Sequence, residues 1–265
     1  LGSLIATIGI SLTKWDLLTP PVWNGIQNYI DIFNNAAFWK AMRNTLTFTA
    51  LYVPGVIISS LAVALLLNRK IRGLSVFRTI YFLPSVTSAV AVGLIFSWLY
   101  AKDNGLLNYV IESLGGQPVN WLGTQWALVS VTLANIWGAV GEGMIIFLAG
   151  LQGVPKDYYE AARVDGASDW KQFTHITLPL ITPSIFFQVL ISSINAFQAF
   201  EYIYMLTRTG NGDSKVPVVV FSIYRNGFFW FNMGGASAQA LVLAVVIILL
   251  MAFYFWAERR WVVYE

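Results

Sequence analysis

Long apolar segments constrain this chain more than any other feature of its sequence. Residues 238–256, for example, contain no charged side chain, and the whole chain is 57% hydrophobic and 11% charged. Soluble domains carry about 25% charged residues, and a helix needs about 20 apolar residues to cross a bilayer. In lipid, each segment must satisfy its own backbone polar groups, which favours helices. We therefore predict an all-α integral membrane protein.

Six apolar segments divide the chain, and the first is shorter than the others. Residues 1–13 are too short to span, so we expect them to be the end of a truncated first helix, with a cleaved signal peptide as the alternative. The five remaining predicted spans are residues 44–67, 83–100, 127–150, 181–200 and 238–256. Because no internal repeat is visible, residues 1–265 are expected to form a single transmembrane domain.

The basic residues indicate how the spans are oriented, because short loops rich in Lys and Arg stay in the cytoplasm. The most basic short segments are the loop after the second span and the C-terminal tail; they contain Arg69, Lys70, Arg72, Arg78, Arg259 and Arg260. By parity, residues 160–184 share their side of the membrane. We therefore place residues 160–184 and the C-terminus in the cytoplasm.

Composition also excludes several classes of function. The formal net charge is +3 and its basic residues are scattered, so nothing indicates a nucleic-acid partner. The chain has no cysteine, which excludes disulfides and thiolate chemistry. His175 is the only histidine and has no acidic residues at metal-ligand spacing, so we expect neither a metal site nor a catalytic site. No Gly-Lys dipeptide occurs, so a Walker A phosphate loop is absent from the sequence.

The segment EAARVDGASDWKQFTHITLPLITPS, residues 160–184, is far more polar than the segments on either side. We expect two short helices here, one over residues 156–164 and one capped by Ser168 or Asp169 and ending near His175, with a break at Gly166. The apolar side chains of this segment are small or flat, which suits insertion into a groove of a partner protein. The alternative is a connector that lies on the lipid surface.

This segment resembles the EAA loop of the permease subunits of binding-protein-dependent ABC importers. The matching residues are Glu160, Ala161, Ala162, Asp165, Gly166, Ala167, Ile176, Leu178 and Pro179. Other matches are Phe77, Arg78, Thr79, Phe82, Leu83, Pro84 and the run FLAGLQGVP before the loop. The ending with Arg260, Trp261, Val262 and Tyr264 is similar to the MalF/UgpA type of sugar permease, not to its MalG/UgpE-type partner. One departure is the run LTRTGNGDS, where the family often has more glycine.

The resemblance implies a type I ABC importer permease fold whose cytoplasmic coupling loop covers about residues 151–180. In that family the loop sits in a cleft of the ATPase, so Glu160 would bond a basic residue there and Gly166 would supply the turn. The chain would form half of the translocation pathway for a mono- or oligosaccharide, delivered by an extracytoplasmic solute-binding protein. It would be a transport subunit and not an enzyme, in a bacterial or archaeal cytoplasmic membrane.

The same resemblance implies the partners. They would be a second permease of the MalG/UgpE type, two cytoplasmic ABC ATPases, the solute-binding protein, the sugar and membrane lipid. No cofactor is expected in this chain, because ATP and Mg would be bound by the ATPase.

Polar residues within the spans are candidates for the substrate pathway, because ionisable and amide groups are costly in lipid. Glu142 lies in the fourth span near Trp137, among small residues; it would contact substrate or, alternatively, pair with another span. The fifth span carries a polar stripe at helical spacing. Its members are Gln188, Ser192, Asn195 and Gln198. The stripe would bind sugar hydroxyls or, alternatively, bond the partner permease.

Two kinds of alternative compete with a sugar importer: another substrate class, and another class of membrane protein. Glycerol-phosphate-type or polyol substrates are the alternative within the importer class, but a phosphodiester should require cationic residues that the spans almost entirely lack. A membrane enzyme would need clustered acids, histidines or a nucleophile, and a channel would favour a self-symmetric pore. Neither pattern is present.

Overall fold

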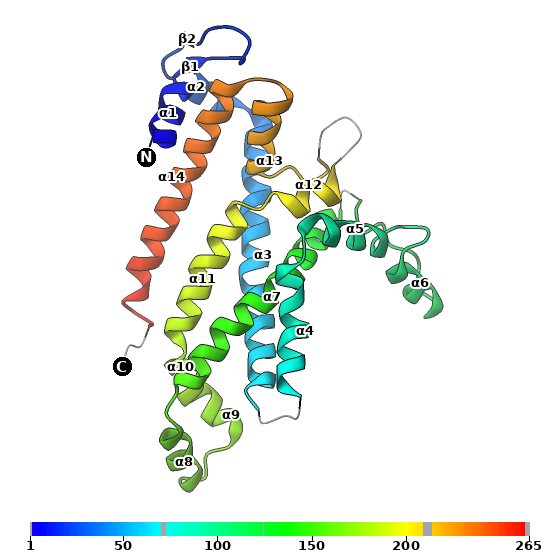
Figure 1. Cartoon of the computed structure of the whole chain (residues 1–265), viewed down its shortest axis with the longest axis vertical. Coiled ribbons are helices and arrows are strands. Elements are labelled where there is room, and N and C mark those ends of the chain that lie inside the picture. Colours follow the sequence, from blue (N-terminus) through cyan, green and yellow to red (C-terminus); the bar gives the residue numbers. More distant parts are fainter. Residues whose placement is uncertain (1, 70–72, 124, 209–213, 263–265) are drawn as a thin grey trace. The chain divides into compact units, whose positions relative to one another are not determined.

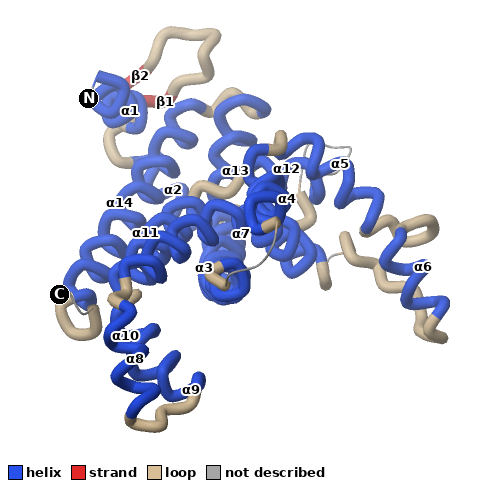
Figure 2. Tube along the Cα trace, turned by 60° about the horizontal axis from the view of Figure 1, so that its bottom comes forward, coloured by secondary structure: helices blue, strands red, loops and turns tan. Residues whose placement is uncertain are grey.

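The computed structural model describes residues 2–69, 73–123, 125–208 and 214–262 (Figure 1). Lys70, Arg72, Tyr264 and most of the LTRTGNGDS run lie outside the described residues. The described elements are helices joined by loops, apart from one small antiparallel strand pair (Figure 2). In chain order they are α1 (Gly2–Ser11), β1 (Thr13–Lys14), β2 (Val22–Trp23), α2 (Gln27–Asn34), α3 (Ala36–Leu67), α4 (Leu74–Val86), α5 (Ala89–Leu99), α6 (Leu106–Ser113), α7 (Ala127–Gly153), α8 (Lys156–Val164), α9 (Asp169–Gln172), the π-helical turn η1 (Phe173–Thr177), α10 (Leu178–Leu180), α11 (Thr182–Phe197), α12 (Glu201–Thr207), α13 (Val219–Tyr224), the π-helical turn η2 (Arg225–Phe229) and α14 (Met233–Glu258).

Three of the described helices, α3, α7 and α14, are long and apolar enough to cross a membrane. The number becomes five if the bent pairs of α4 with α5 and of Asp169–Leu180 with α11 each count as one span. α1 is apolar but has only 10 residues, as expected for the first segment. The all-α membrane fold is therefore confirmed, and α3 continues through Pro54 without a break.

The third predicted span, residues 83–100, is not one continuous helix. α4 begins nine residues earlier than expected, at Leu74, and ends at Val86, and α5 begins at Ala89 after a bend of 96°. Pro84 lies in the last turn of α4 and lacks the backbone N–H that a helix interior needs, and Thr87 adopts an extended conformation with ψ 140°. The hydropathy of the segment predicted a membrane span but did not predict the bend.

The chain divides into two compact units, and the divisions fall within α3, α7, α11 and α14 and between α4 and α5. Unit 1 comprises residues 1–51, 88–134 and 194–250. Its apolar core brings together α2, α3, α11, α13 and α14; the buried members are Ile32, Phe38, Ala41, Met42, Phe197, Val219, Ala238 and Leu243.

Asn108 organises a polar connection of unit 1, residues 100–126, which we call the Asn108 loop. The side chain is 1% exposed. Its amide nitrogen donates to the carbonyls of Lys102 and Val119, both at 2.9 Å. Its amide oxygen accepts from the Val119 N–H and from Trp121 Nε1, both at 3.0 Å. One buried side chain therefore holds three separate points of the loop.

Unit 2 comprises residues 52–87, 135–193 and 251–265 and is built around α7. Its buried core residues are Ala64, Leu67, Met144, Phe147, Leu148, Leu151, Val154 and Ile181.

Three glycines of α7 allow the neighbouring helices of unit 2 to approach closely. A Cβ at Gly141 would lie 2.5 Å from the carbonyl oxygen of Tyr81 on α4. At Gly143 it would lie 2.8 Å from Ser60 Cβ on α3, and at Gly150 it would lie 3.0 Å from Ser184 Cβ on α11. Small residues permit such approach between membrane helices. α7 therefore packs closely against a different helix at each glycine.

Candidate functional site

The coupling loop forms the two short helices that the sequence predicts, with the first at its expected bounds. α8 covers Lys156–Val164 after Pro155, whose fixed backbone angle suits the start of a helix. Asp157 lies in the first turn and Arg163 in the last, so both charges complement the helix dipole.

Gly166 supplies the turn that ends α8, because its φ of +75° lies in the left-handed region that glycine adopts without strain. The Gly166 N–H donates to the Arg163 carbonyl at 3.1 Å, and the Ala167 N–H donates to the Ala162 carbonyl at 2.8 Å. These two bonds form a Schellman motif, which satisfies the last carbonyls of the helix. The predicted break at Gly166 is confirmed.

The second helix differs from the expectation at its C-terminal end. Ser168 caps α9, accepting from the Lys171 N–H at 3.4 Å, but α9 ends at Gln172 and the helical path does not stop at His175. It continues as the π-helical turn η1 and then as α10, up to Leu180. No sequence signal of a π-helical turn was available, because such turns differ from α-helix only in hydrogen-bond spacing.

Side chains on the inner face anchor the loop to itself. Tyr159 on α8 and Thr177 in η1 share a hydrogen bond between hydroxyl groups at 2.9 Å. Gln172 is 7% exposed, and its amide nitrogen donates to the Ala167 carbonyl at 2.9 Å. Tyr159 and Ile176 also pack against the buried core of unit 2. Both ends of the loop are therefore fixed to the same core.

The outer face of the loop is left open. Glu160, Ala161, Asp165 and Gly166 are exposed, whereas Ala162, Ala167 and Pro179 are half-buried. Large apolar side chains are exposed beside them: Tyr158 is 50%, Trp170 is 72% and Val164 is 87% exposed. Because Val164 and Trp170 flank the Gly166 turn, a partner that covers this turn would also bury apolar surface.

The two candidate pathway residues of α7 are both exposed. Trp137 is 44% exposed, and Glu142 lies between the buried Gly141 and Gly143 with its own side chain exposed. Within the described part of the chain, no hydrogen bond links Glu142 to Gln188 or Ser192. The neighbouring Gly143 packs close to the stripe, because a Cβ there would lie 3.2 Å from Gln188 Nε2.

The polar stripe separates into a buried pair and an exposed pair. Gln188 and Ser192 are 3% and 1% exposed, and Gln188 Nε2 donates to Ser192 Oγ at 2.9 Å. The Gln188 side-chain oxygen is buried and has no hydrogen-bond partner. Asn195 and Gln198 are exposed, and Gln198 lies beyond the end of α11 at Phe197. The spacing placed all four residues on one helical face but could not indicate which of them neighbours would cover.

An aromatic cluster lies around α12 in unit 1. Phe200 stacks on Tyr204 with ring centroids 5.2 Å apart, and Tyr224 lies 5.1 Å from Phe200 and 5.6 Å from Tyr204. Arg208 donates to the Tyr204 hydroxyl at 2.8 Å, and this hydrogen bond lowers the Tyr204 pKa. A cavity of about 450 Å³ lies beside the cluster, lined by Ser88, Ala89, Val90, Phe200, Glu201, Tyr204 and Met205. The four-residue spacing of Phe200, Tyr204 and Arg208 was the available signal.

A search of the described residues for three or more His, Cys, Asp or Glu side chains placed to hold a metal ion finds no such group. His175 is exposed, and its Nδ1 lies 2.8 Å from the Thr174 hydroxyl.

Comparisons with known proteins agree on one family. The family model of the binding-protein-dependent transport system inner membrane component matches residues 55–263. The lactose transport system permease protein LacF of Rhizobium radiobacter is 33% identical over 246 residues, covering 90% of this chain and 82% of that protein.

Two solved structures are also similar. One is the crystal structure of a bacterial ABC transporter involved in the import of the acidic polysaccharide alginate; it has a TM-score of 0.84 and 27% identity, and covers 97% of this chain and 89% of the matched chain. The other is a bacterial alginate ABC transporter in complex with an alginate pentasaccharide-bound periplasmic protein, with a TM-score of 0.81, 28% identity, and coverage of 89% and 83%.

These matches extend over most of the chain. The resemblance to importer permeases is confirmed, and the relatives are transport permeases and not enzymes. The chain belongs to the binding-protein-dependent transport system inner membrane components, the membrane-embedded permease subunits of ABC importers.

Proposed function

We propose that this permease forms half of the translocation pathway of a sugar importer, for a mono- or oligosaccharide delivered by an extracytoplasmic solute-binding protein. The names of its relatives support this substrate class, since LacF is a lactose permease and the similar transporter imports alginate. The periplasmic protein in the second alginate structure supports a solute-binding protein as one partner. The other half of the pathway would be a second permease of the MalG/UgpE type.

The proposal for the ATPase partners rests on the exposed face of the coupling loop. Its outer face presents Glu160 with exposed Tyr158, Val164 and Trp170, and its inner face is fixed to the core of unit 2 through Tyr159. An exposed surface on a rigid support suits docking into a preformed cleft. We place this face, with Ala161, Ala162, Asp165, Gly166, Ala167 and Pro179, against one of two cytoplasmic ATPases that bind ATP and Mg.

The orientation follows from this assignment. The coupling loop and the C-terminus would both lie in the cytoplasm of a bacterial or archaeal cell, in agreement with the basic residues at the ends of α3 and α14. ATP binding would close the ATPases, and the motion would pass through the loop into α7 and α11. The permease itself would hold no nucleotide.

Gln188 is the strongest candidate for a pathway residue. Its side-chain oxygen is buried without a partner, and leaving such a group unsatisfied costs roughly 1 to 3 kcal/mol. A substrate hydroxyl or a water molecule reaching this oxygen would remove the cost. We keep Ser192, Trp137 and Glu142 in the proposed pathway with it. Asn195 and Gln198 are proposed because their amides are exposed and free to meet substrate.

The test is to purify the tagged permease with its neighbouring gene products and measure ATP hydrolysis against a panel of sugars, with and without the binding protein. We expect a second permease and ATPases to copurify, and one loaded binding protein to raise the rate. Glycerol phosphate and polyols belong in the panel as competing substrates. A permease that purifies without an ATPase would contradict the assignment of the coupling loop.

A further inference from the structure

The cavity beside α12 in unit 1, which we call the α12 cavity, has no part in the pathway proposed above. Its volume is about 450 Å³. Small-molecule sites in proteins commonly have volumes of about 300 to 1,000 Å³. The walls come from the first residues of α5 and of α12, two helices that lie side by side (Figure 1). The α12 cavity is therefore large enough to hold a small molecule.

A close contact between α5 and α12 closes one end of the α12 cavity. A Cβ at Gly93 would lie 2.8 Å from Met205 Cβ, so the two helices touch there. Four residues earlier on each helix, Ala89 and Glu201 line open space instead. Because the Glu201 side chain is exposed, a ligand from solvent can reach the cavity at this end.

Two aromatic rings line the α12 side of the cavity. Phe200 and Tyr204 both face it, and their rings are stacked with centroids 5.2 Å apart. Arg208 donates to the Tyr204 hydroxyl at 2.8 Å, and the Tyr224 ring packs edge-on against Tyr204 at 5.6 Å. These contacts fix the rings before a ligand arrives, which reduces the entropy that binding would cost.

Two polar groups of the α12 cavity have hydrogen-bonding capacity that the protein does not use. Ser88 occupies the N-cap position of α5, but its side chain makes no capping hydrogen bond. Among the described residues, none donates a hydrogen bond to the Glu201 carboxylate. A carboxylate accepts hydrogen bonds through two oxygens, and a serine hydroxyl both donates and accepts. A ligand rich in hydroxyl groups would satisfy both side chains.

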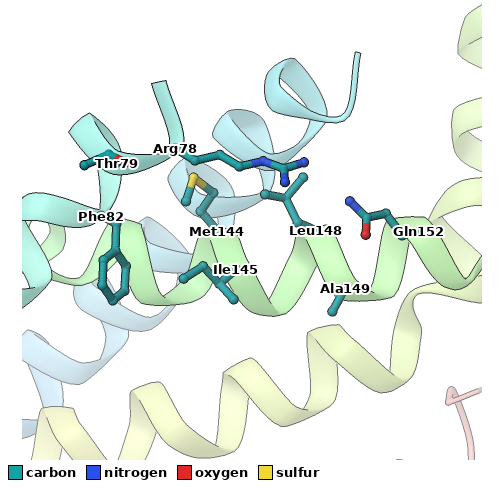
Figure 3. Close-up of a pocket in the computed structure, with 8 residues that line it drawn as sticks. All are labelled: Arg78, Thr79, Phe82, Met144, Ile145, Leu148, Ala149 and Gln152. Carbon is teal, nitrogen blue, oxygen red and sulfur yellow. The ribbon is translucent and has the colours of Figure 1, made fainter. Parts of the chain in front are cut away.

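The cavity between α4 and α7 in unit 2, of about 370 Å³, has different walls (Figure 3). Arg78 extends along it toward Gln152, and Phe82 lies at the other end. Among the described residues that line it, Phe82 is the one aromatic residue and none is acidic. The combination of stacked rings, a carboxylate and a hydroxyl therefore distinguishes the α12 cavity from the cavity in unit 2.

The chemistry of the walls selects a neutral sugar. The C–H face of a sugar ring packs on aromatic planes, and its hydroxyls donate to carboxylate and serine oxygens. An organic cation would also suit rings and a carboxylate, but the Arg208 guanidinium already lies 5.1 Å from the Tyr204 ring centroid and would repel it. Glu201 would repel an acidic sugar. A neutral sugar is the ligand that all of these groups can contact.

The α12 cavity follows directly after the exposed end of the polar stripe. Gln198 precedes Glu201 by three residues, so their Cα atoms lie at most about 11 Å apart, at 3.6 Å per residue. One unit of an oligosaccharide can therefore meet Gln198 while the next unit occupies the cavity.

We propose that the α12 cavity is a second sugar subsite, which holds one neutral sugar unit against the rings of Phe200 and Tyr204 and the oxygens of Ser88 and Glu201. This rests on the sugar importer function proposed above and adds a specificity to it. Because Glu201 is negatively charged, the subsite prefers a neutral sugar to the uronate of the same ring.

Saturation-transfer difference NMR on the assembled importer, in detergent and without binding protein or nucleotide, tests this. The probes are methyl β-glucoside and methyl β-galactoside, each paired with its uronate, in which a carboxylate replaces the C6 hydroxymethyl group. We expect the wild type to bind at least one neutral glycoside more tightly than its uronate. Glu201→Gln should lower the affinity for the neutral glycoside about threefold to tenfold, because an amide oxygen is a weaker acceptor than a carboxylate. The same variant should raise the affinity for the uronate, and Phe200→Leu should lower both affinities.

Glu112→Gln is the matched control, because Glu112 is an exposed acid of the same unit that does not line the cavity. It should keep the wild-type affinities for both members of each pair. Copurification of the other subunits shows that each variant has assembled, and if Phe200→Leu does not assemble, Glu201→Gln decides. A structural role of Glu201 would not change the affinities for the two kinds of sugar in opposite directions.

ATP hydrolysis by the same preparations, measured with the loaded binding protein, tests the proposed function separately. An importer that responds to a sugar, but binds neither glycoside or binds each glycoside and its uronate equally, overturns the subsite alone. Unchanged affinities in the assembled Glu201→Gln variant overturn it as well. An importer whose ATP hydrolysis responds to no sugar of the panel contradicts the proposed function.

Discussion

The two polar connections of this permease, the Asn108 loop and the coupling loop, are stabilised in opposite ways. In the Asn108 loop one side chain, 1% exposed, bonds four backbone and side-chain groups. In the coupling loop the hydrogen bonds lie on the inner face, and charged and apolar side chains remain exposed on the outer face. The first loop satisfies its own polar groups, whereas the second leaves a surface that a partner can cover.

The largest expected effect of this difference concerns transport. Glu160→Ala in the coupling loop should reduce sugar uptake by about tenfold or more, because it would remove one partner of the charge-assisted hydrogen bond that we propose to the ATPase. Uptake of labelled sugar by cells with equal amounts of membrane-inserted protein measures this. Glu112→Ala, which removes an exposed acid from the Asn108 loop, is the control and should leave uptake unchanged. Normal uptake by Glu160→Ala would show that transport depends no more on the exposed acid of the coupling loop than on that of the Asn108 loop.

The second prediction concerns the stability of the protein, and here a substitution in the Asn108 loop should have a large effect. Asn108→Ala should destabilise the protein by about 3 kcal/mol, because it leaves several buried backbone groups without partners. Thermal unfolding of the purified importer in detergent measures the effect. Asn104→Ala, at an exposed position of the same loop, should change the melting temperature little. Equal melting temperatures for the two variants would show that Asn108 does not hold the loop.

The third prediction compares one glycine from each of these loops, Gly105 and Gly166. A Cβ at Gly105 would lie 2.7 Å from the Leu99 carbonyl oxygen, so Gly105→Ala should cost about 1 to 3 kcal/mol through overpacking. At Gly166 nothing lies within 4 Å, so Gly166→Ala should cost only about 1 to 2 kcal/mol of left-handed backbone strain. The melting temperatures of the two variants measure which substitution destabilises the protein more. Gly166→Asn separates strain from packing, since Asn tolerates this conformation better and should recover part of the loss.

The smallest expected effect concerns the anchor of the coupling loop. Tyr159→Phe removes one hydroxyl but keeps the ring that packs on the core of unit 2, so the loss should be about 1 kcal/mol. Tyr158→Phe, on the exposed face, should cost less. Hydrogen exchange of the amides in α8 provides the comparison, with faster exchange expected only for Tyr159→Phe. The same rate in both variants would mean that the hydroxyl pair does not anchor the loop.

Some local features of the molecule could be predicted from the sequence and others could not, for physical reasons. Pro155 and Gly166 are strong local signals, so α8 was predicted at its observed bounds of Lys156–Val164. The bend of 96° between α4 and α5 was missed, because hydropathy reports burial in lipid and not direction. Pro84 was visible in the sequence, but proline in a membrane helix is compatible with a kink, a bend or a nearly straight helix, as Pro54 in α3 demonstrates.

The sequence predicted which candidate pathway residues share a helical face, but not which of them are buried. Helical spacing put Gln188 and Ser192 on the same face, and the structure shows that they are buried and bonded to each other. Which residues are covered depends on a neighbouring helix, and one sequence without contacts does not contain that information. Arg78 illustrates the same limit: the sequence showed it as a basic residue and as part of the family match, but could not indicate that it lines a pocket beside α7.

The three glycines of α7 restrict how this protein can vary. A Cβ at Gly141, Gly143 or Gly150 would lie 3.0 Å or less from an atom of a different neighbouring helix. In a library that randomises every position of α7 and selects for uptake, these positions should return glycine almost without exception. Val129 and Leu133, which are 37% and 50% exposed, should return many different apolar residues. The tolerance of α7 to substitution is therefore set by its smallest residues, and not by its largest.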